Sequence, residues 1–161
     1  MTITAMDDYA IGQANEADLP ELVALLGVLF GIEQDFRADA EKQRRGLAML
    51  LAEPGRAVVL VARQTGDDSR AVAMATAQLV ISTAEGAPSA WIEDVVVAPE
   101  HRGRGLGTRL LAALVDWART AGASRAQLLV DLDNAPALDF YDGLGWTATR
   151  LAARRISLAA R

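Results

Sequence analysis

The chain has 161 residues, 52% of them apolar and 23% charged, which is typical of one folded domain and excludes a disordered segment. It has no cysteine and one histidine, His101, so we expect no disulfide framework, no metal site and no Ser-His-Asp triad. A net charge of −5 predicts a surface that repels nucleic acid. Without a signal peptide or an apolar run of about 18 residues, we expect a cytoplasmic protein that does not bind membranes.

The first half of the chain predicts one strand, two helices and two more strands. Capping residues over 15–18, followed by Pro20, indicate the start of the first helix. A turn over 66–69 separates the last two strands, so they are expected to pair with each other. The expected elements are a strand over 9–14, a first helix that ends near 31, a second helix over 39–52, and strands over 57–63 and 71–82.

The second half alternates strands and helices. Apolar residues at helical spacing begin at Leu106, and Gly122 ends that helix. Asn134 and Pro136 indicate the start of a shorter helix. The expected elements are a strand over 91–97, these two helices with a strand over 126–132 between them, and a last pair of strands over 146–149 and 153–158. This order predicts one α/β domain over residues 1–161, with helices on the faces of a mixed sheet.

A glycine-rich loop leads into the helix that begins at Leu106. The start of a helix leaves about four backbone N–H groups without partners, and its dipole attracts negative charge. Glycines put no side chain between those amides and a bulky anion, and arginines raise the local potential. The loop and the first helical turn contain Gly103, Gly105 and Gly107 together with Arg102, Arg104 and Arg109. This stretch therefore predicts a diphosphate site.

The spacing of the loop decides which kind of phosphate site it resembles. A Walker loop ends in Gly-Lys-Ser/Thr, whereas this loop ends in Gly107-Thr108-Arg109. A Rossmann fingerprint places Gly-x-Gly-x-x-Gly directly after the strand, whereas five residues separate Val97 from Gly103 here. The stretch 102–107 instead resembles the Arg/Gln-x-x-Gly-x-Gly/Ala signature of the GCN5-related N-acetyltransferases. The plain alternative is a glycine-rich turn with incidental arginines.

This resemblance implies an acetyl-coenzyme A site. In that family the loop amides hold the pyrophosphate, and the preceding strand pairs with the pantetheine arm through its backbone. The residues that match these roles are Val95, Val96, Val97, Arg102, Gly103, Arg104, Gly105, Leu106, Gly107 and Thr108. The resemblance also implies the family's fold, a mixed and mostly antiparallel sheet of about six to seven strands flanked by about four helices.

A second stretch, Asn134 to Trp146, is similar to the family's Asn-x-x-Ala-x-x-Phe-Tyr-x-x-x-Gly-Phe signature, with Trp146 in place of the last Phe. The resemblance implies that Asn134 bonds the pantetheine arm and that the Tyr141 hydroxyl protonates the leaving thiolate. Taken alone, the stretch is also explained by a helix cap followed by aromatic core residues. The resemblance is specific over 91–146, the expected acetyl-coenzyme A core, whereas residues 15–53 belong to the region that shapes the acceptor site.

Two consecutive carboxylates, Glu93 and Asp94, precede the cofactor residues on the same expected strand. An alkylammonium has a pKa of about 10.4, so under ~0.1% of it is nucleophilic at pH 7 and a base is needed. By resemblance to the polyamine and glucosamine-6-phosphate acetyltransferases, we expect Glu93 to be the base through a water and Asp94 to orient or bind the acceptor. Consecutive strand residues face opposite sides, so at most one should face the acetyl group. A solvated ion pair is the plain alternative.

Other candidates for the acceptor site are weaker. Some relatives carry a catalytic glutamate five residues before the position of Asn134, but this chain has Leu129 there. Asp131 is a further candidate base, although a role as a turn or cap residue explains its presence better. Phe30 and Glu33 fall where the first two helices meet, in the region that covers the acceptor in the family.

These residues together predict an acetyl-coenzyme A-dependent N-acetyltransferase that acts by direct transfer, without metal, on a small primary amine such as that of a cationic metabolite. A protein N-terminus or lysine is the alternative acceptor. A module that binds coenzyme A or a dinucleotide without turnover is the alternative of another class, and it needs neither Tyr141 nor Glu93. A homodimer is common in the family, but no residue of this chain proves one.

Overall fold

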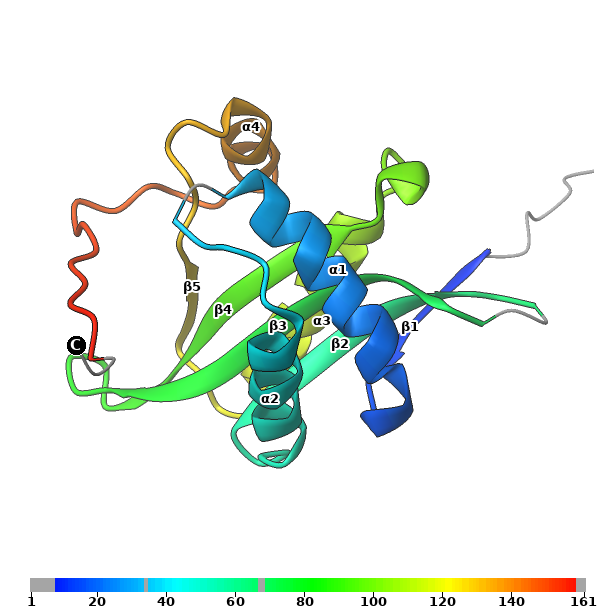
Figure 1. Ribbon diagram of the computed structural model, residues 1–161. Coiled ribbons are helices and arrows are strands. Elements are labelled where there is room, and N and C mark those ends of the chain that lie inside the picture. Colours follow the sequence, from blue (N-terminus) through cyan, green and yellow to red (C-terminus); the bar gives the residue numbers. More distant parts are fainter. Residues whose placement is uncertain (1–7, 34, 67–68, 159–161) are drawn as a thin grey trace, which may run out of the picture. The chain divides into compact units, whose positions relative to one another are not determined.

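The computed structural model describes residues 8–33, 35–66 and 69–158. The chain divides into two compact units, Met1–Leu129 and Val130–Arg161. The amino-terminal unit contains the sheet and three α-helices, and the carboxy-terminal unit contains the helix α4, Ala135–Gly143 (Figure 1). In the parts of the chain that the structure describes, no helix combines the length and the apolar character needed to cross a membrane.

The five strands of the sheet lie side by side in chain order. Each neighbouring pair is antiparallel except β4 and β5, which are parallel. A parallel pair needs a crossover connection, and here it contains the helix α3, Leu106–Thr120. The strands are β1 (Tyr9–Gln13), β2 (Ala57–Gln64), β3 (Ala71–Ser82), β4 (Ala87–Val97) and β5 (Arg125–Leu128).

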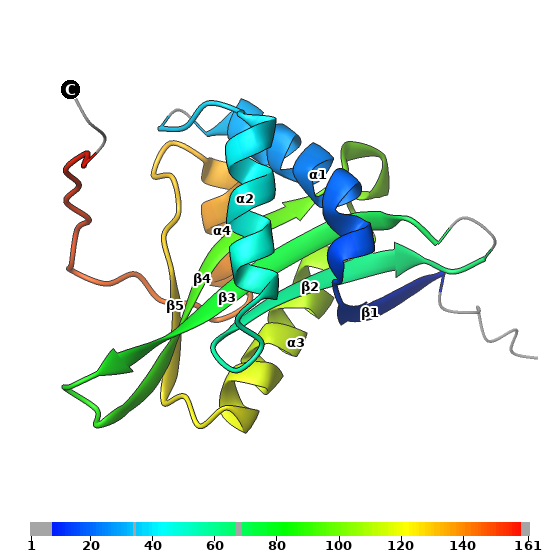
Figure 2. The same ribbon diagram turned by 60° about the horizontal axis from the view of Figure 1, so that its bottom comes forward.

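Helices cover both faces of this sheet. The helices α1 (Leu19–Ile32) and α2 (Ala40–Leu51) lie on one face and α3 lies on the other (Figure 2). Leucines three and four residues apart give α1 one buried side, which packs with Leu47 of α2 against the sheet. The residues of this core include Leu22, Leu25, Leu26, Leu47, Val59, Val61, Met74 and Val96. Two short 3₁₀ turns, Glu16–Asp18 and Pro99–His101, precede α1 and α3.

Most of the expected elements are present, with small shifts at their ends. The strand over 71–82 has the expected bounds, and the second helix differs by one residue at each end. The fourth strand begins earlier than residue 91, at Ala87, and pairs back on β3 through a tight hairpin. The fifth strand ends at Leu128 instead of 132.

The expected last pair of strands, over 146–149 and 153–158, is wrong. Residues 146–158 form no strand, so the described sheet has five strands and not six to seven. The apolar residues of this stretch are interrupted by Arg150, Arg154 and Arg155. A strand also needs a partner for its ladder of backbone hydrogen bonds, and none is paired with it in the part of the chain that is described.

Candidate active site

The pairing of β3 with β4 is irregular where the two carboxylates of β4 lie. The register shifts between Ala75 and Ala77, so the single residue Thr76 faces both Glu93 and Asp94. An extra residue of this kind forms a β-bulge, which bends the strand and redirects a side chain. The simple alternation expected from the sequence therefore fails at this point, and Glu93 and Asp94 line the same cavity.

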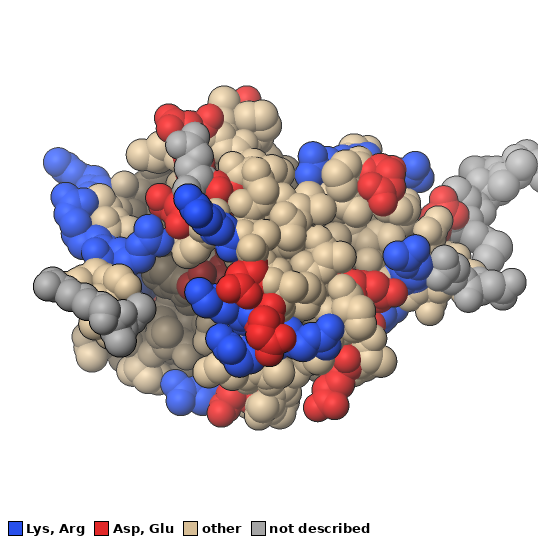
Figure 3. All heavy atoms as spheres, in the orientation of Figure 1, with Lys and Arg blue, Asp and Glu red and all other residues tan. Residues whose placement is uncertain are grey.

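This cavity has a volume of about 640 Å³ and lies between α1, α2 and strands β2 to β4. Figure 3 shows the surface hollowed beside α2, with acidic and basic side chains gathered along that helix. Part of the wall is apolar, and Phe30 and Phe36 lie in ring contact at 5.6 Å. The apolar lining residues include Leu26, Phe30, Phe36, Leu47, Leu50 and Leu79. A volume of this size fits a small organic molecule.

The two carboxylates of the bulge have different surroundings. Thr76 donates its hydroxyl to Asp94 Oδ2 at 3.0 Å and accepts from the Asp94 backbone N–H at 3.2 Å. Burial raises the pKa of Asp94, although the bond from Thr76 opposes that rise, and the charge of Glu93 adds to it. Glu93 is exposed and accepts from Trp91 Nε1 at 2.8 Å. The site therefore combines a fixed, half-buried carboxyl with an exposed one.

Several lining residues have no counterpart in the sequence-based prediction. Phe30 lines the cavity as expected, but Glu33 is not among the lining residues. Additional charged side chains come from α2 and the loops on either side of it, namely Arg37, Lys42, Glu53 and Arg56. Gln43 lines the cavity as well. The sequence signal for Gln43 is its place on an amphipathic helix, one turn before the buried Leu47 and on the same side.

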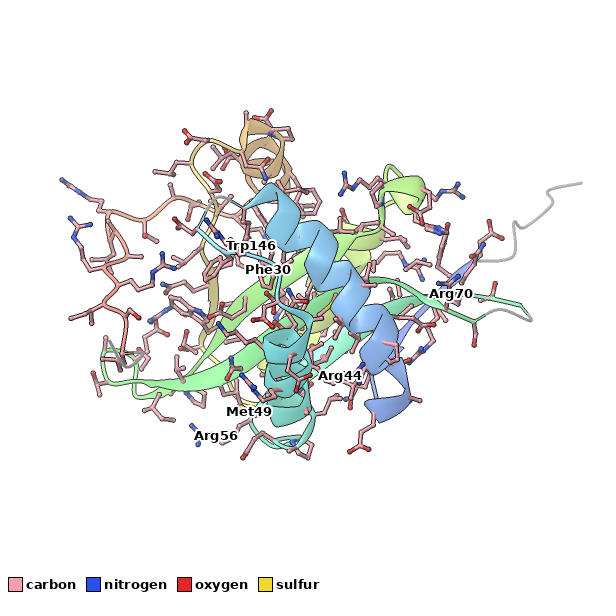
Figure 4. All side chains as sticks on the ribbon, in the orientation of Figure 1. Phe30, Arg44, Met49, Arg56, Arg70 and Trp146 are labelled. Atoms are coloured by element: carbon pink, nitrogen blue, oxygen red, sulfur yellow. The ribbon has the colours of Figure 1, made fainter. Side chains whose placement is uncertain are left out.

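Figure 4 labels Met49 and Arg44 on different sides of α2. Met49 lines the cavity and Arg44 does not. Both side chains belong to the exposed part of the helix, so the two positions separate the cavity side of α2 from the side that faces away from it.

The glycine-rich loop has the backbone geometry of an anion site. Gly103 and Gly105 have φ values of 73° and 74°, in the left-handed region that glycine adopts at little cost. Gly105 is the N-cap of α3, and no side chain caps this helix. A Cβ built at either glycine would meet no heavy atom within 4 Å. The space beside both glycines is therefore open and no side chain caps the first turn of α3, as a bound diphosphate requires.

The arginines and the histidine near this loop differ in their contacts. Arg102 donates Nε to the Val97 carbonyl at 3.1 Å, and Arg104 is exposed. Arg109 donates to the Tyr9 carbonyl at 3.0 Å, so it also attaches α3 to β1. His101 bonds the Tyr9 hydroxyl through Nδ1 at 2.9 Å, which gives it a structural contact. Arg102 and Arg104 are thus the side chains most accessible to an anion.

The end of β4 that leads into this loop is paired on one edge only. The parallel register of β4 with β5 ends at the pair Ile92 and Leu128. Within the sheet as described, residues 95–97 of β4 therefore pair with β3 alone, and residues 93 and 94 form the bulge. An unpaired strand edge offers backbone N–H and C=O groups to an extended ligand.

The carboxy-terminal unit contains the second expected motif. Asn134 Oδ1 accepts from the Ala137 N–H at 3.2 Å and caps α4, in agreement with the plain structural explanation of this residue. Asp131 accepts from the Asp133 N–H at 2.9 Å, which is a turn contact. The Tyr141 ring meets that of Trp146 at 6.2 Å, edge to face. The roles of Asn134 and Tyr141 toward acetyl-coenzyme A stay predictions.

Comparison with known proteins gives the family. The family model described as "Acetyltransferase (GNAT) family" matches residues 20–146. The chain belongs to this family. The match runs from the first helix through the bulge and the glycine-rich loop to Trp146, so it covers the cavity and both motifs.

Individual GNAT relatives match either a part of this chain or the whole chain at low sequence identity. Streptothricin acetyltransferase of Streptomyces lavendulae is 44% identical over 63 residues, which are 36% of this chain and 33% of that protein. Mycothiol acetyltransferase of Rhodococcus opacus (strain B4) is 27% identical over 149 residues, 81% of this chain and 49% of that one. An aminoglycoside N-acetyltransferase solved with CoA is 18% identical and has a TM-score of 0.78, over 98% of this chain and 100% of that one. The chain thus spans half or less of these two curated relatives, and the solved structure shows the fold.

Proposed function

We propose that this GNAT chain transfers the acetyl group of acetyl-coenzyme A directly to the primary amine of a small molecule. The observation that carries the proposal is the bulge of β4, which puts Glu93 and Asp94 on one wall of a cavity large enough for such an amine. The same strand runs from the bulge into the glycine-rich loop. The strand β4 would therefore contact an amine in the cavity and lead directly to a diphosphate on the loop.

Acetyl-coenzyme A fits the residues of the loop. The pyrophosphate would lie against the first amides of α3, where Gly103 and Gly105 leave open space, with Arg102 and Arg104 nearby. The pantetheine arm would pair with the free edge of β4 at Val95, Val96 and Val97. A backbone N–H of that edge would also stabilise the oxyanion that develops on the thioester carbonyl.

The reaction needs one proton acceptor and one proton donor. The amine nitrogen attacks the carbonyl carbon, the C–S bond breaks, and sulfur leaves as thiolate. We propose that Glu93, the accessible carboxylate, takes the amine proton through a water and that Tyr141 gives a proton to the sulfur. Asp94, held by Thr76, would bind and orient the ammonium before it loses its proton. Asp94, whose pKa is raised by burial, is the alternative candidate for the base if Glu93 does not take the proton.

We further propose that the chain is cytoplasmic and forms a homodimer. The composition favours a cytoplasmic location and the family resemblance favours a homodimer. Cell fractionation and light scattering on the purified chain measure these two properties directly.

Ligand-dependent melting tests the cofactor. Acetyl-coenzyme A should raise the melting temperature of the chain, because a ligand that binds only the folded state stabilises it. NAD and ATP should raise it much less at the same concentration. Equal stabilisation by NAD would replace the acetyltransferase proposal with a dinucleotide-binding one.

A further inference from the structure

Gln43 is a polar residue in a buried position of α2. Its side chain is 8% exposed, and the residue one turn later on the same side of the helix, Leu47, belongs to the core. Among the residues described, the Gln43 Nε2 atom is buried and makes no hydrogen bond. A buried amide donor without a partner is costly, so its presence needs an explanation.

The cavity gives that explanation. Gln43 lines it together with Thr76 and Asp94. The Thr76 hydroxyl and the Asp94 carboxylate bond each other, and neither accepts a hydrogen bond from the amide of Gln43. Nε2 only donates, so its partner must be an acceptor atom, and an ammonium group has none to offer. A ligand oxygen meets this requirement.

The cavity wall is therefore complementary to two different groups in one ligand. The carboxylates of the bulge, Glu93 and Asp94, attract an ammonium, and the amide of Gln43 attracts an oxygen. Phe30 and Phe36 offer an apolar surface for the rest of the molecule. We propose that Gln43 determines specificity, by donating a hydrogen bond to an oxygen of the acceptor, so that the acceptor is a primary amine with a carbonyl, carboxylate or hydroxyl group and an apolar part. This inference rests on the proposed function.

Matched amines test the preference. L-phenylalaninamide and phenethylamine share an amine and a ring and differ in the carboxamide, and L-leucinamide and isoamylamine form a second such pair. The carboxamide also lowers the pKa of the neighbouring amine from about 10 toward about 8, so each kcat/KM is expressed per concentration of free amine. With acetyl-coenzyme A, the wild-type chain should have a kcat/KM about tenfold to a hundredfold higher for the amide of a pair, as expected for one hydrogen bond to a buried donor. Equal values within a pair would overturn the inference.

Variants assign the preference to Gln43. Gln43→Leu should abolish the difference within a pair, through a higher KM for the amide. Gln43→Leu should also melt no lower than the wild type, because an apolar side chain replaces an unpaired donor. Arg44→Ala, the neighbouring α2 residue outside the cavity, is the control and should keep the preference.

The outcomes separate the two proposals. Acetylation of both members of a pair with a preference that survives in Gln43→Leu overturns the role of Gln43 and keeps the proposed function. An equal fall in kcat/KM for both amines together with a lower melting temperature assigns Gln43 a structural role and overturns the inference too. No acetyl transfer to any amine, in a chain that binds acetyl-coenzyme A, overturns the proposed function and the inference that rests on it.

Discussion

Gly105 offers a sharp test of the diphosphate site, because a matched control lies just beyond the other end of the same helix. Gly105 begins α3 with φ 74°, and Gly122 follows its end with φ 79°. Neither would bring a Cβ within 4 Å of another atom, so replacement by alanine adds strain without a clash at either end. Left-handed backbone costs an alanine about 1–2 kcal/mol. For a chain of this size, that cost lowers the melting temperature by about 2–8 °C.

Only one of the two variants should affect the cofactor. The Cβ of Gly105→Ala would stand in the open space in front of the first amides of α3, where the pyrophosphate is proposed to lie. Losing one charge-assisted hydrogen bond weakens binding by about tenfold or more. Titration calorimetry with acetyl-coenzyme A measures this, alongside melting curves of both variants. If Gly105→Ala and Gly122→Ala bind the cofactor equally well, the diphosphate is held elsewhere.

Three other substitutions test single groups. Tyr141→Phe should lower kcat by roughly tenfold to a thousandfold in steady-state assays, with acetyl-coenzyme A affinity kept, and an unchanged kcat would remove the proposed acid. The deficit of Glu93→Gln should shrink as the pH approaches the amine's own pKa of about 10, whereas a constant deficit would move the base to Asp94. Asp18 accepts two bonds from Arg63, at 2.5 and 2.6 Å, which lower its pKa. This stabilisation is present above the unfolded pKa and is lost on acidification, so melting curves of wild type and Asp18→Asn should converge below about pH 4.

Local pattern was enough to predict most elements of the amino-terminal unit. The leucines of α1 recur every three to four residues, and the strand over 71–82 is a long apolar run that begins after a turn. The glycine-rich loop was also predictable, because Gly103 and Gly105 are required by the backbone conformation itself. These signals lie within a few residues of the feature that they specify.

Features that depend on pairing between distant residues were missed. The bulge at Glu93 and Asp94 exists only when β4 is aligned with β3, and the sequence of β4 alone supports only the general expectation that consecutive side chains face opposite sides. The proposed role of Gln43 depends on α2 lining one cavity with Thr76, which lies 33 residues later in the chain. The expected strands over 146–158 are the opposite case. Their local pattern predicted strands, but no partner strand pairs with them in the described part of the chain.

The most direct test of the central claim is amine-dependent release of free thiol from acetyl-coenzyme A. The purified chain is assayed with a panel of small primary amines, amino sugars and peptides, and each product is weighed by mass spectrometry. The account predicts thiol release with at least one small amine, a product heavier by one acetyl group, and strongly reduced release by Glu93→Gln near neutral pH. Stabilisation by acetyl-coenzyme A without thiol release for any amine would contradict it and would make the chain a coenzyme A-binding module.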